Sequence, residues 1–301
     1  MKINLPIIVF ILLLSSGCVK DLDIKPKEHP PQLVIHCIFH PDSSWVLAVG
    51  HTISPLEPKK ELPRVENAIV KITDSMGNAV TLLHDSVGVY INPTHYPKIG
   101  ERYFLEVSAP GFETVTASEE VPEPIQILSV DTQSVIHNPA NNWKKLTVSV
   151  DFKDEVAYKN FYSFVIEYVY VQWNPGSIPE YYRTWLGNYQ YYSQSNVMGI
   201  GCHKEGNFND EIFNGKNFQL NTTLNGECGG SPSFTYELTL MLRSITESYY
   251  NYLNSYHSLG NIENNLLPPT QFYTNIKNGY GIFIGFSTSK KEITYTYKHS
   301  P

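Results

Sequence analysis

The sequence predicts a mainly β protein, in which an immunoglobulin-like or transthyretin-like β-sandwich is followed by a second β-rich domain with one amphipathic helix. Three observations favour this class. Short apolar stretches recur along most of the chain and are separated by turn-forming residues. Only 17% of the residues are charged while 13% are aromatic, a balance typical of chains that form sheets. One segment, near residues 244–257, combines a helix start signal with helical spacing of apolar side chains.

Residues 32–120 are predicted to form the first sandwich from seven short strands. At 102–108, Tyr103, Leu105 and Val107 alternate with mostly polar neighbours, as in a strand with one buried face. Turn-forming residues separate the strands. The expected strands are 32–39, 45–52, 68–73, 79–84, 88–91, 102–108 and 113–118.

The first expected strand has a wholly apolar face that contains Cys37. Residues 33, 35, 37 and 39 share this face because strand side chains alternate with a period of two. Cys37 is therefore expected to be a buried, unreactive thiol.

A proline-containing linker at 121–124 separates the sandwich from a second β-rich domain over residues 125–301. The stretch 161–173 is apolar on both faces, which predicts an interior position in its sheet. Residues 174–232 are rich in Tyr, Asn, Gly and Ser and are predicted to be irregular. The expected strands are 127–132, 145–152, 161–173, 234–243, 281–287 and 292–297.

The helix is predicted near residues 244–257. Ser244 and Glu247 have the spacing of a capping box, in which both side chains satisfy amide donors at a helix start. Isoleucine and tyrosine side chains then follow at helical spacing, and Gly260 can end the helix. The tyrosine stripe is expected to pack on a sheet.

The chain begins with the pattern of a bacterial lipoprotein signal peptide. An apolar run at 5–14 is followed by the small residues 15–17 and then by Cys18. The run is too short to span a bilayer as a helix. Residues 1–17 are therefore expected to be removed and Cys18 to be lipidated, which makes residues 18–31 an anchor and tether. An ordinary secretory signal is the alternative.

Acyl chains on Cys18 would hold the protein to a membrane. Lys20, Asp21 and Asp23 follow at once, and this short pattern resembles the surface-export signal of Bacteroidota lipoproteins. The expected location is the outer membrane, facing the cell surface, with the periplasmic face as the alternative. A solvated linker without a signal is the other interpretation of these charges.

Composition and motifs exclude several classes of function. The net charge of −7, without a basic run, argues against a nucleic-acid partner. The chain has no nucleophile elbow, zinc helix, phosphate loop or dinucleotide fingerprint, so no enzyme activity, cofactor or metal is expected. A surface hydrolase that combines two distant carboxylates is a remaining alternative. Asp151, Asp154 and Glu155 lack calcium-loop spacing and are expected to form a structural turn.

Cys202 and Cys228 lie in one loop-rich region, and export implies an oxidising compartment. A disulfide between these two cysteines is predicted, and two free thiols are the alternative.

Aromatic side chains are concentrated between residues 168 and 192, where part of the chain is expected to be a loop. Flat rings on loops can stack on a small ligand such as a sugar, or anchor a protein partner. The alternative is that they pack as a small core over the second sheet. The candidate residues are Trp173, Tyr181, Tyr182, Trp185 and Tyr189.

The segments 32–39, 65–77, 88–90, 100–107 and 268–283 carry a resemblance that covers nearly the whole chain. On these segments the chain resembles the domain-of-unknown-function 4249 family, lipoproteins of the Bacteroidota. The last segment, with its two glycines around Tyr280, is the most specific. Those glycines are expected to permit a tight bend with a bulge, ahead of contact with a ligand. The pair His36-Cys37 departs from the family pattern, where an acidic residue and glycine are expected.

The family has no established activity or site, so the resemblance implies no functional residue. Members are typically encoded beside TonB-dependent outer-membrane receptors. The resemblance therefore implies an accessory binding or docking lipoprotein of an uptake system, whose small ligand is unknown. A surface adhesin or structural lipoprotein is the alternative, and a surface hydrolase is a further one.

Overall fold

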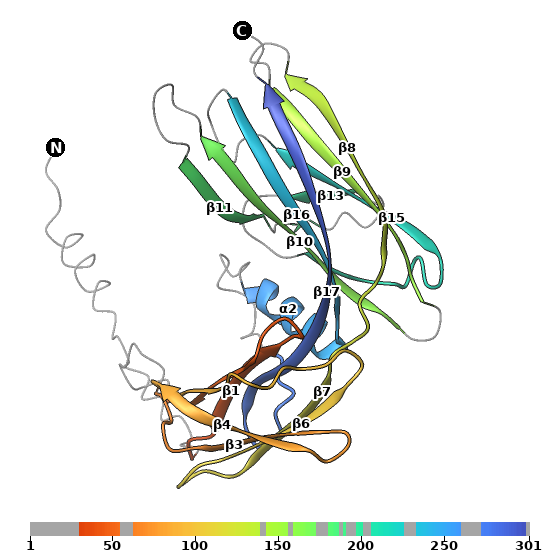
Figure 1. Ribbon diagram of the computed structural model, residues 1–301. Helices are drawn as coiled ribbons and strands as arrows, with labels where there is room; N and C mark the ends of the chain where they lie inside the picture. Colours follow the sequence, from red (N-terminus) through yellow and green to blue (C-terminus); the bar gives the residue numbers. More distant parts are fainter. Residues whose placement is uncertain are drawn as a thin grey trace, which may run out of the picture. The chain divides into compact units, whose positions relative to one another are not determined.

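Strands make up most of the described chain, which confirms the predicted mainly β class (Figure 1). One helix is present among the described residues and carries the label α2. The computed structural model describes residues 30–54, 63–138, 143–155, 159–172, 180–186, 189–190, 197–200, 206–225, 233–259 and 272–298.

The larger of two sheets has twelve strands. They are β1 (Leu33–Phe39), β2 (Trp45–His51), β3 (Ile69–Asp74), β4 (Ala79–Ser86), β5 (Val89–Asn92), β6 (Arg102–Ser108), β7 (Val115–Glu120), β10 (Phe161–Gln172), β11 (Glu180–Leu186), β14 (Gly206–Asn209), β16 (Ser233–Ile245) and β17 (Tyr280–Lys298). Their order is β11-β10-β16-β17-β1-β2-β5-β4-β3-β6-β7, and β14 also pairs with β10. The seven strands expected for the first sandwich are confirmed, with ends shifted by two residues at most.

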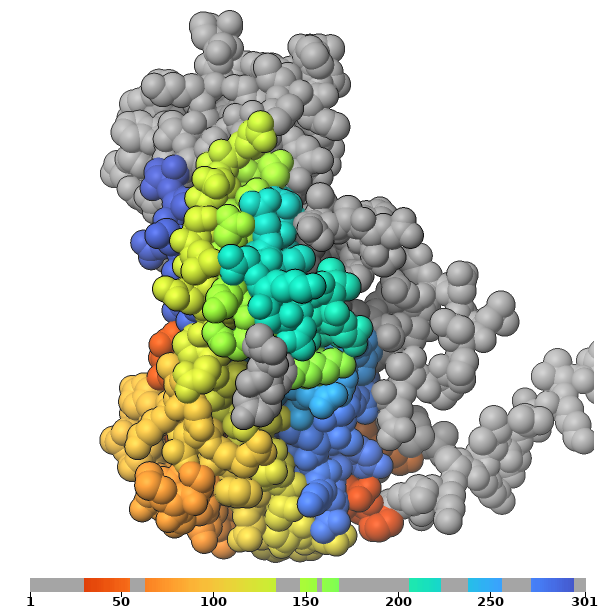
Figure 2. Space-filling view, turned by 90° about the vertical axis from the view of Figure 1, so that its right-hand side faces the viewer, coloured from red at the N-terminus to blue at the C-terminus, as the bar shows by residue number. Residues whose placement is uncertain are grey.

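The smaller sheet has five strands in the order β12-β13-β15-β9-β8. They are β8 (Ile127–Asn138), β9 (Trp143–Lys153), β12 (Tyr189–Gln190), β13 (Val197–Ile200) and β15 (Asn217–Asn225). Figure 2 shows residues of β15 and of the turn before it (teal) beside β9 (green). The helix α2 (Glu247–Leu259) directly follows β16.

The first core lies between the inner faces of β1 to β7. Cys37 is fully buried there, as predicted, and burial raises the pKa of its thiol. The rings of Phe39, Trp45 and Phe283 meet in this core, with Phe39 4.9 Å from Trp45 and 4.6 Å from Phe283. Phe283 comes from β17, so the closing segment supplies part of the first core.

The second core lies between the two sheets. Ile166 of β10 and Leu240 of β16 pack with Val150 of β9 and Leu220 of β15, and none is more than 1% exposed. The predicted interior position of β10 is confirmed, since it pairs with β16 on one side and with β11 and β14 on the other.

The helix covers the opposite face of the larger sheet. Tyr249 and Leu253 of α2 pack with Ile282, Ile284 and Phe286 of β17. The expectation that the tyrosine stripe packs on a sheet is confirmed for Tyr249, which is 4% exposed.

The closing segment is one strand instead of the two that were expected. Residues 280–285 pair in parallel with β1, and residues 286–298 pair antiparallel with β16. The polar residues 288–291 do not interrupt β17 because β16 pairs with each of them. β17 therefore belongs to both halves of the larger sheet, while the boundary at 121–124 stays a prediction.

The expectation that residues 174–232 are irregular is wrong. Five strands, β11 to β15, lie in this stretch. Pairing with β10 and β9 satisfies the backbone groups of these strands, although their own side-chain pattern is weak. The strands in this stretch form because they pair with neighbouring strands, although the periodicity of their own sequence is weak.

The predicted capping box is also wrong. Ser244 is still part of β16, and its hydroxyl accepts a hydrogen bond from the Ile125 amide at 3.1 Å. The capping residue is Thr246, whose Oγ1 accepts a hydrogen bond from the Tyr249 amide at 3.3 Å. The strand persists to Ile245 because β10 and β17 pair with it on both sides.

Candidate functional site

Four of the residues singled out in the sequence lie outside the described residues. They are Cys18, Trp173, Cys202 and Cys228. The lipid attachment and the disulfide therefore stay predictions.

The other aromatic candidates lie on strands and not on a loop. Tyr181, Tyr182 and Trp185 are in β11, and Tyr189 is in β12. β11 forms the edge of the larger sheet beside β10. The expected loop setting is thus wrong for these four residues, while their role in binding stays a prediction.

The register of four strands places tyrosines opposite one another. Tyr182 pairs with Tyr170, Tyr170 with Tyr236, and Tyr236 with Tyr295. We refer to these four residues as the tyrosine row.

The register also places the other two aromatic candidates of β11. Trp185 pairs with Glu167 of β10, and Tyr181 pairs with Val171.

The described residues also contain a buried polar cluster at the ends of β9 and β10. Asp154 is fully buried, and its carboxylate accepts hydrogen bonds from the Tyr162 hydroxyl, the Asn160 side-chain amide at 3.2 Å and the Gly215 amide at 2.7 Å. The Asp154 amide in turn donates to the Lys216 carbonyl at 3.1 Å. This Asp154 cluster fastens the turn between β14 and β15 to β9 and β10.

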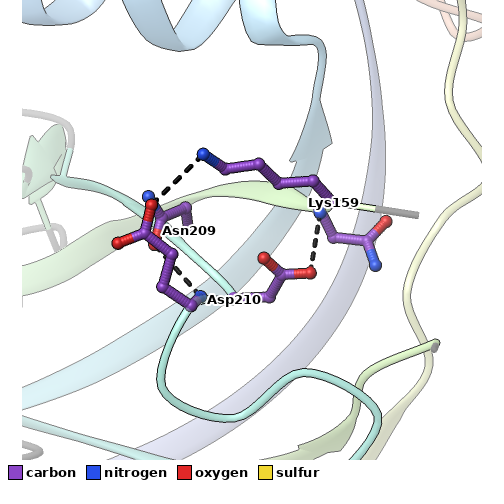
Figure 3. A network of polar contacts seen from close by, with 5 residues as sticks. Lys159, Asn209 and Asp210 are labelled. Carbon is purple, nitrogen blue, oxygen red and sulfur yellow. Dashed lines mark hydrogen bonds and ion pairs between the residues drawn. The ribbon is translucent and has the colours of Figure 1, made fainter. Parts of the chain in front are cut away.

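Asp210, which is 1% exposed, fixes the other end of the same turn (Figure 3). Its carboxylate accepts a hydrogen bond from the Asn160 amide at 2.8 Å, and its carbonyl accepts from the Phe213 amide at 2.9 Å. Beside it, Lys159 and Glu211 form an exposed ion pair at 3.2 Å. Exposed pairs contribute little to stability, so the buried carboxylates hold this turn.

The hydrogen bonds of the Asp154 cluster have a structural role. Desolvation, followed by the hydrogen bond to Asp154, raises the pKa of the Tyr162 hydroxyl, so this group stays protonated and donates. Asp154 is fully buried and accepts from three donors, which leaves it no access to a substrate. The expected structural role of Asp154 agrees with these contacts.

Sequence reasoning missed Tyr162, Asp210 and Glu119. The first two lie far apart along the chain, and only the turn after β14 brings them together. Glu119 lies on β7, where buried and less buried positions alternate, and it occupies a position expected to be buried. A carboxylate at a buried position is a signal in the sequence that indicates a partner for it.

Glu119 connects β7 to the start of α2. It is 7% exposed, and its carboxylate accepts hydrogen bonds from the hydroxyls of Ser248 and Thr246. The Glu120 amide donates to the same carboxylate at 3.1 Å. Even so, desolvation raises the pKa of Glu119 above its ordinary value of 4.5, because burial disfavours the charged form.

This raised pKa predicts a pH dependence of stability. The folded chain holds the Glu119 proton more tightly than the unfolded chain, so its contribution is complete below pH 4.5 and falls as the pH rises through the folded-state pKa. We expect Glu119→Gln, which stays neutral, to gain in free energy of unfolding over wild type between pH 4 and pH 7. Urea unfolding at both pH values measures this difference. Glu106→Gln, the same change at an exposed position, serves as the control. If the free energy of unfolding depends on pH equally in Glu119→Gln and in wild type, the assignment is refuted.

Within the ranges that the structure describes, no group of three or more His, Cys, Asp or Glu side chains is placed to hold a metal ion. No helix of the described chain has the length and apolar character needed to cross a membrane.

A family model described as a domain of unknown function, DUF4249, matches residues 19–292. No curated protein matches the chain.

Proposed function

The chain belongs to the DUF4249 family, and on this premise we propose that it is an outer-membrane lipoprotein that docks to a TonB-dependent receptor. Its lipid is attached at Cys18, and its β-rich part faces the cell surface. It acts there as an accessory component of the receptor during uptake of a small ligand.

The observation that carries the docking proposal is the position of β11. Among the described strands β11 pairs with β10 alone, at the edge of the larger sheet. An edge strand offers backbone donors and acceptors to a second chain. Tyr181 and Trp185 add aromatic side chains of the kind that anchors protein partners.

The N-terminal sequence supports the location. The apolar run at 5–14 and the small residues 15–17 precede Cys18, as in lipoprotein signal peptides. Two or more acyl chains give stable anchoring, whereas a single chain gives marginal binding.

The test is a copurification from the native outer membrane in mild detergent, with mass spectrometry of the bound proteins. The tagged wild-type chain is compared with the double variant Tyr181→Ser and Trp185→Ser. Phe104→Ser serves as the control, since Phe104 is an aromatic residue that is 46% exposed on another strand. We expect one TonB-dependent receptor to copurify in equal amount with wild type and control, and far less with the double variant.

Two results would count against the proposal. Recovery of the wild-type lipoprotein alone would overturn docking and favour a surface adhesin. Equal recovery of the receptor with the double variant, in a protein that unfolds at the wild-type temperature, would place the contact away from β11.

A further inference from the structure

A row of aliphatic side chains, three of them exposed, crosses the outer face of the first sandwich. The register pairs Val46 of β2 with Ile91 of β5, and Ile91 with Leu83 of β4. Ile69 of β3 continues the row, because the neighbouring residues Val70 and Leu82 pair with each other. We refer to these four residues as the aliphatic row.

Three of the four members are exposed although they are strongly apolar, and Ile91 is half-buried. Val46 is 47% exposed, Ile69 67% and Leu83 71%. The core face is already occupied, since Val70 and Leu82 next to them in sequence are buried in the first core. The row is therefore a second apolar surface on these strands, directed away from the core.

Val87, at the tip of the hairpin between β4 and β5, extends this surface. It is 64% exposed and has a φ of 42°, and Gly88 follows with a φ of 74°. Two positive φ values in succession are usual for Asn-Gly in such a turn, and a β-branched residue is strained there. An apolar valine is therefore exposed at a strained position whose positive φ suits asparagine better.

This hairpin tip lies at the end of the sandwich where the chain enters β1. Val49 pairs with Ile35 of β1, and its amide donates to the Gly88 carbonyl at 2.8 Å. Only eleven residues lie between Cys18 and Pro30, the first described residue. An extended chain of that length spans at most about 40 Å, so a lipid at Cys18 would keep this end near the membrane.

We propose that the aliphatic row and Val87 contact the bilayer surface that holds the lipid anchor, an inference that rests on the proposed anchoring at Cys18. The exposed area of such a row is on the order of a few hundred Å², below the roughly 800 Å² per partner of a stable dimer. A tether removes the need for a large area, because it keeps the surface at high effective concentration near the lipid.

Charge next to the row does not select anionic lipid. Lys71 follows Ile69 by two residues, and Asp85 follows Leu83 by two, so charges of opposite sign flank the row. The contact is therefore apolar, and its strength is expected to be the same on neutral and anionic bilayers.

The first test measures depth with tryptophan and lipids that carry bromine on their acyl chains. The full acylated chain is placed in phosphatidylcholine vesicles as Val87→Trp or as Met76→Trp. Met76 is 72% exposed in the turn between β3 and β4, at the opposite end of β4. We expect strong quenching of the tryptophan at position 87 and none at position 76.

The second test removes the anchor. The Cys18→Ser chain is mixed with vesicles of phosphatidylcholine, with and without phosphatidylglycerol, and the bound fraction is measured by flotation. Leu83→Asp is expected to weaken binding about tenfold on both kinds of vesicle. Thr81→Asp, an exposed change two residues away on the same strand, should have little effect.

The outcomes separate this inference from the proposed function. An acylated chain whose tryptophan at position 87 is not quenched would overturn the bilayer contact and leave the anchor standing. Absence of an acyl group on Cys18 would refute the anchor, while the flotation test still decides the contact. Sedimentation of wild type as a dimer that Leu83→Asp dissociates would assign the row to a second copy of this chain and overturn the proposal.

Discussion

Replacing Gly281 by alanine is expected to abolish the folded state or to lower the free energy of unfolding by more than about 4 kcal/mol. Gly281 pairs with Ile35, and a Cβ atom at this position would overlap with the Ile35 carbonyl oxygen and lie 2.8 Å from its carbonyl carbon. The φ of Gly281 is 102°, which side chains rarely adopt. Strands β1 and β17 would have to separate, and that opens the first core at Phe283.

Gly77→Ala provides the matched control. Gly77 also has a positive φ, 88°, but nothing lies within 4 Å of the position that its Cβ would take. Only the conformational term remains there, so a loss of about 1–2 kcal/mol is expected. Chemical denaturation followed by circular dichroism measures both variants. Similar losses for Gly77→Ala and Gly281→Ala would show that β1 and β17 can move apart at little cost. That result would contradict the prediction that the backbone contact at Gly281 excludes a side chain.

Removing the Asp154 carboxylate is expected to lower the free energy of unfolding by about 3–5 kcal/mol. Asp154→Ala deprives the Tyr162 hydroxyl and the Gly215 amide of their acceptor in a fully buried place. The turn between β14 and β15 then keeps its attachment through Asp210 but loses the one through Asp154. Guanidinium unfolding gives the magnitude, and hydrogen exchange at the Gly215 amide reports the release of the turn.

Two further variants identify the cause of the stability loss in Asp154→Ala. Asp151→Ala changes the same residue type three positions earlier, where the side chain accepts from Ser129 and Gln219 near the surface, and should cost about 1 kcal/mol or less. Tyr162→Phe removes one of the three donors to Asp154 and should lie between the two. If Asp154→Ala is no worse than Asp151→Ala, the cluster does not hold the turn.

Local pattern was enough to predict the strands of the first sandwich. In β6, Tyr103, Leu105 and Val107 are buried while the residues between them are exposed, as alternation requires. Cys37 followed the same rule. These residues belong to short strands with clear turns between them, so each strand could be identified without knowledge of its partners.

Where structure depends on distant partners, the sequence pattern was not sufficient. β11 has little periodicity of its own and exists because β10 pairs with it along seven residues. Ser244 has the spacing of a helix cap but stays in β16, since strands on both sides bind its neighbours. The carboxylates of Asp154 and Asp210 are 56 residues apart (210 − 154), and Asn160 contacts both of them only in the folded chain.

The parallel pairing of β1 with β17 also sets the order in which the chain can fold. Val34 lies opposite Tyr280, a separation of 246 residues (280 − 34), so the first sandwich cannot be completed until almost the whole chain has been synthesised. Pairings of such long range form slowly. The first sandwich therefore stays incomplete during synthesis until the residues of β17 are present.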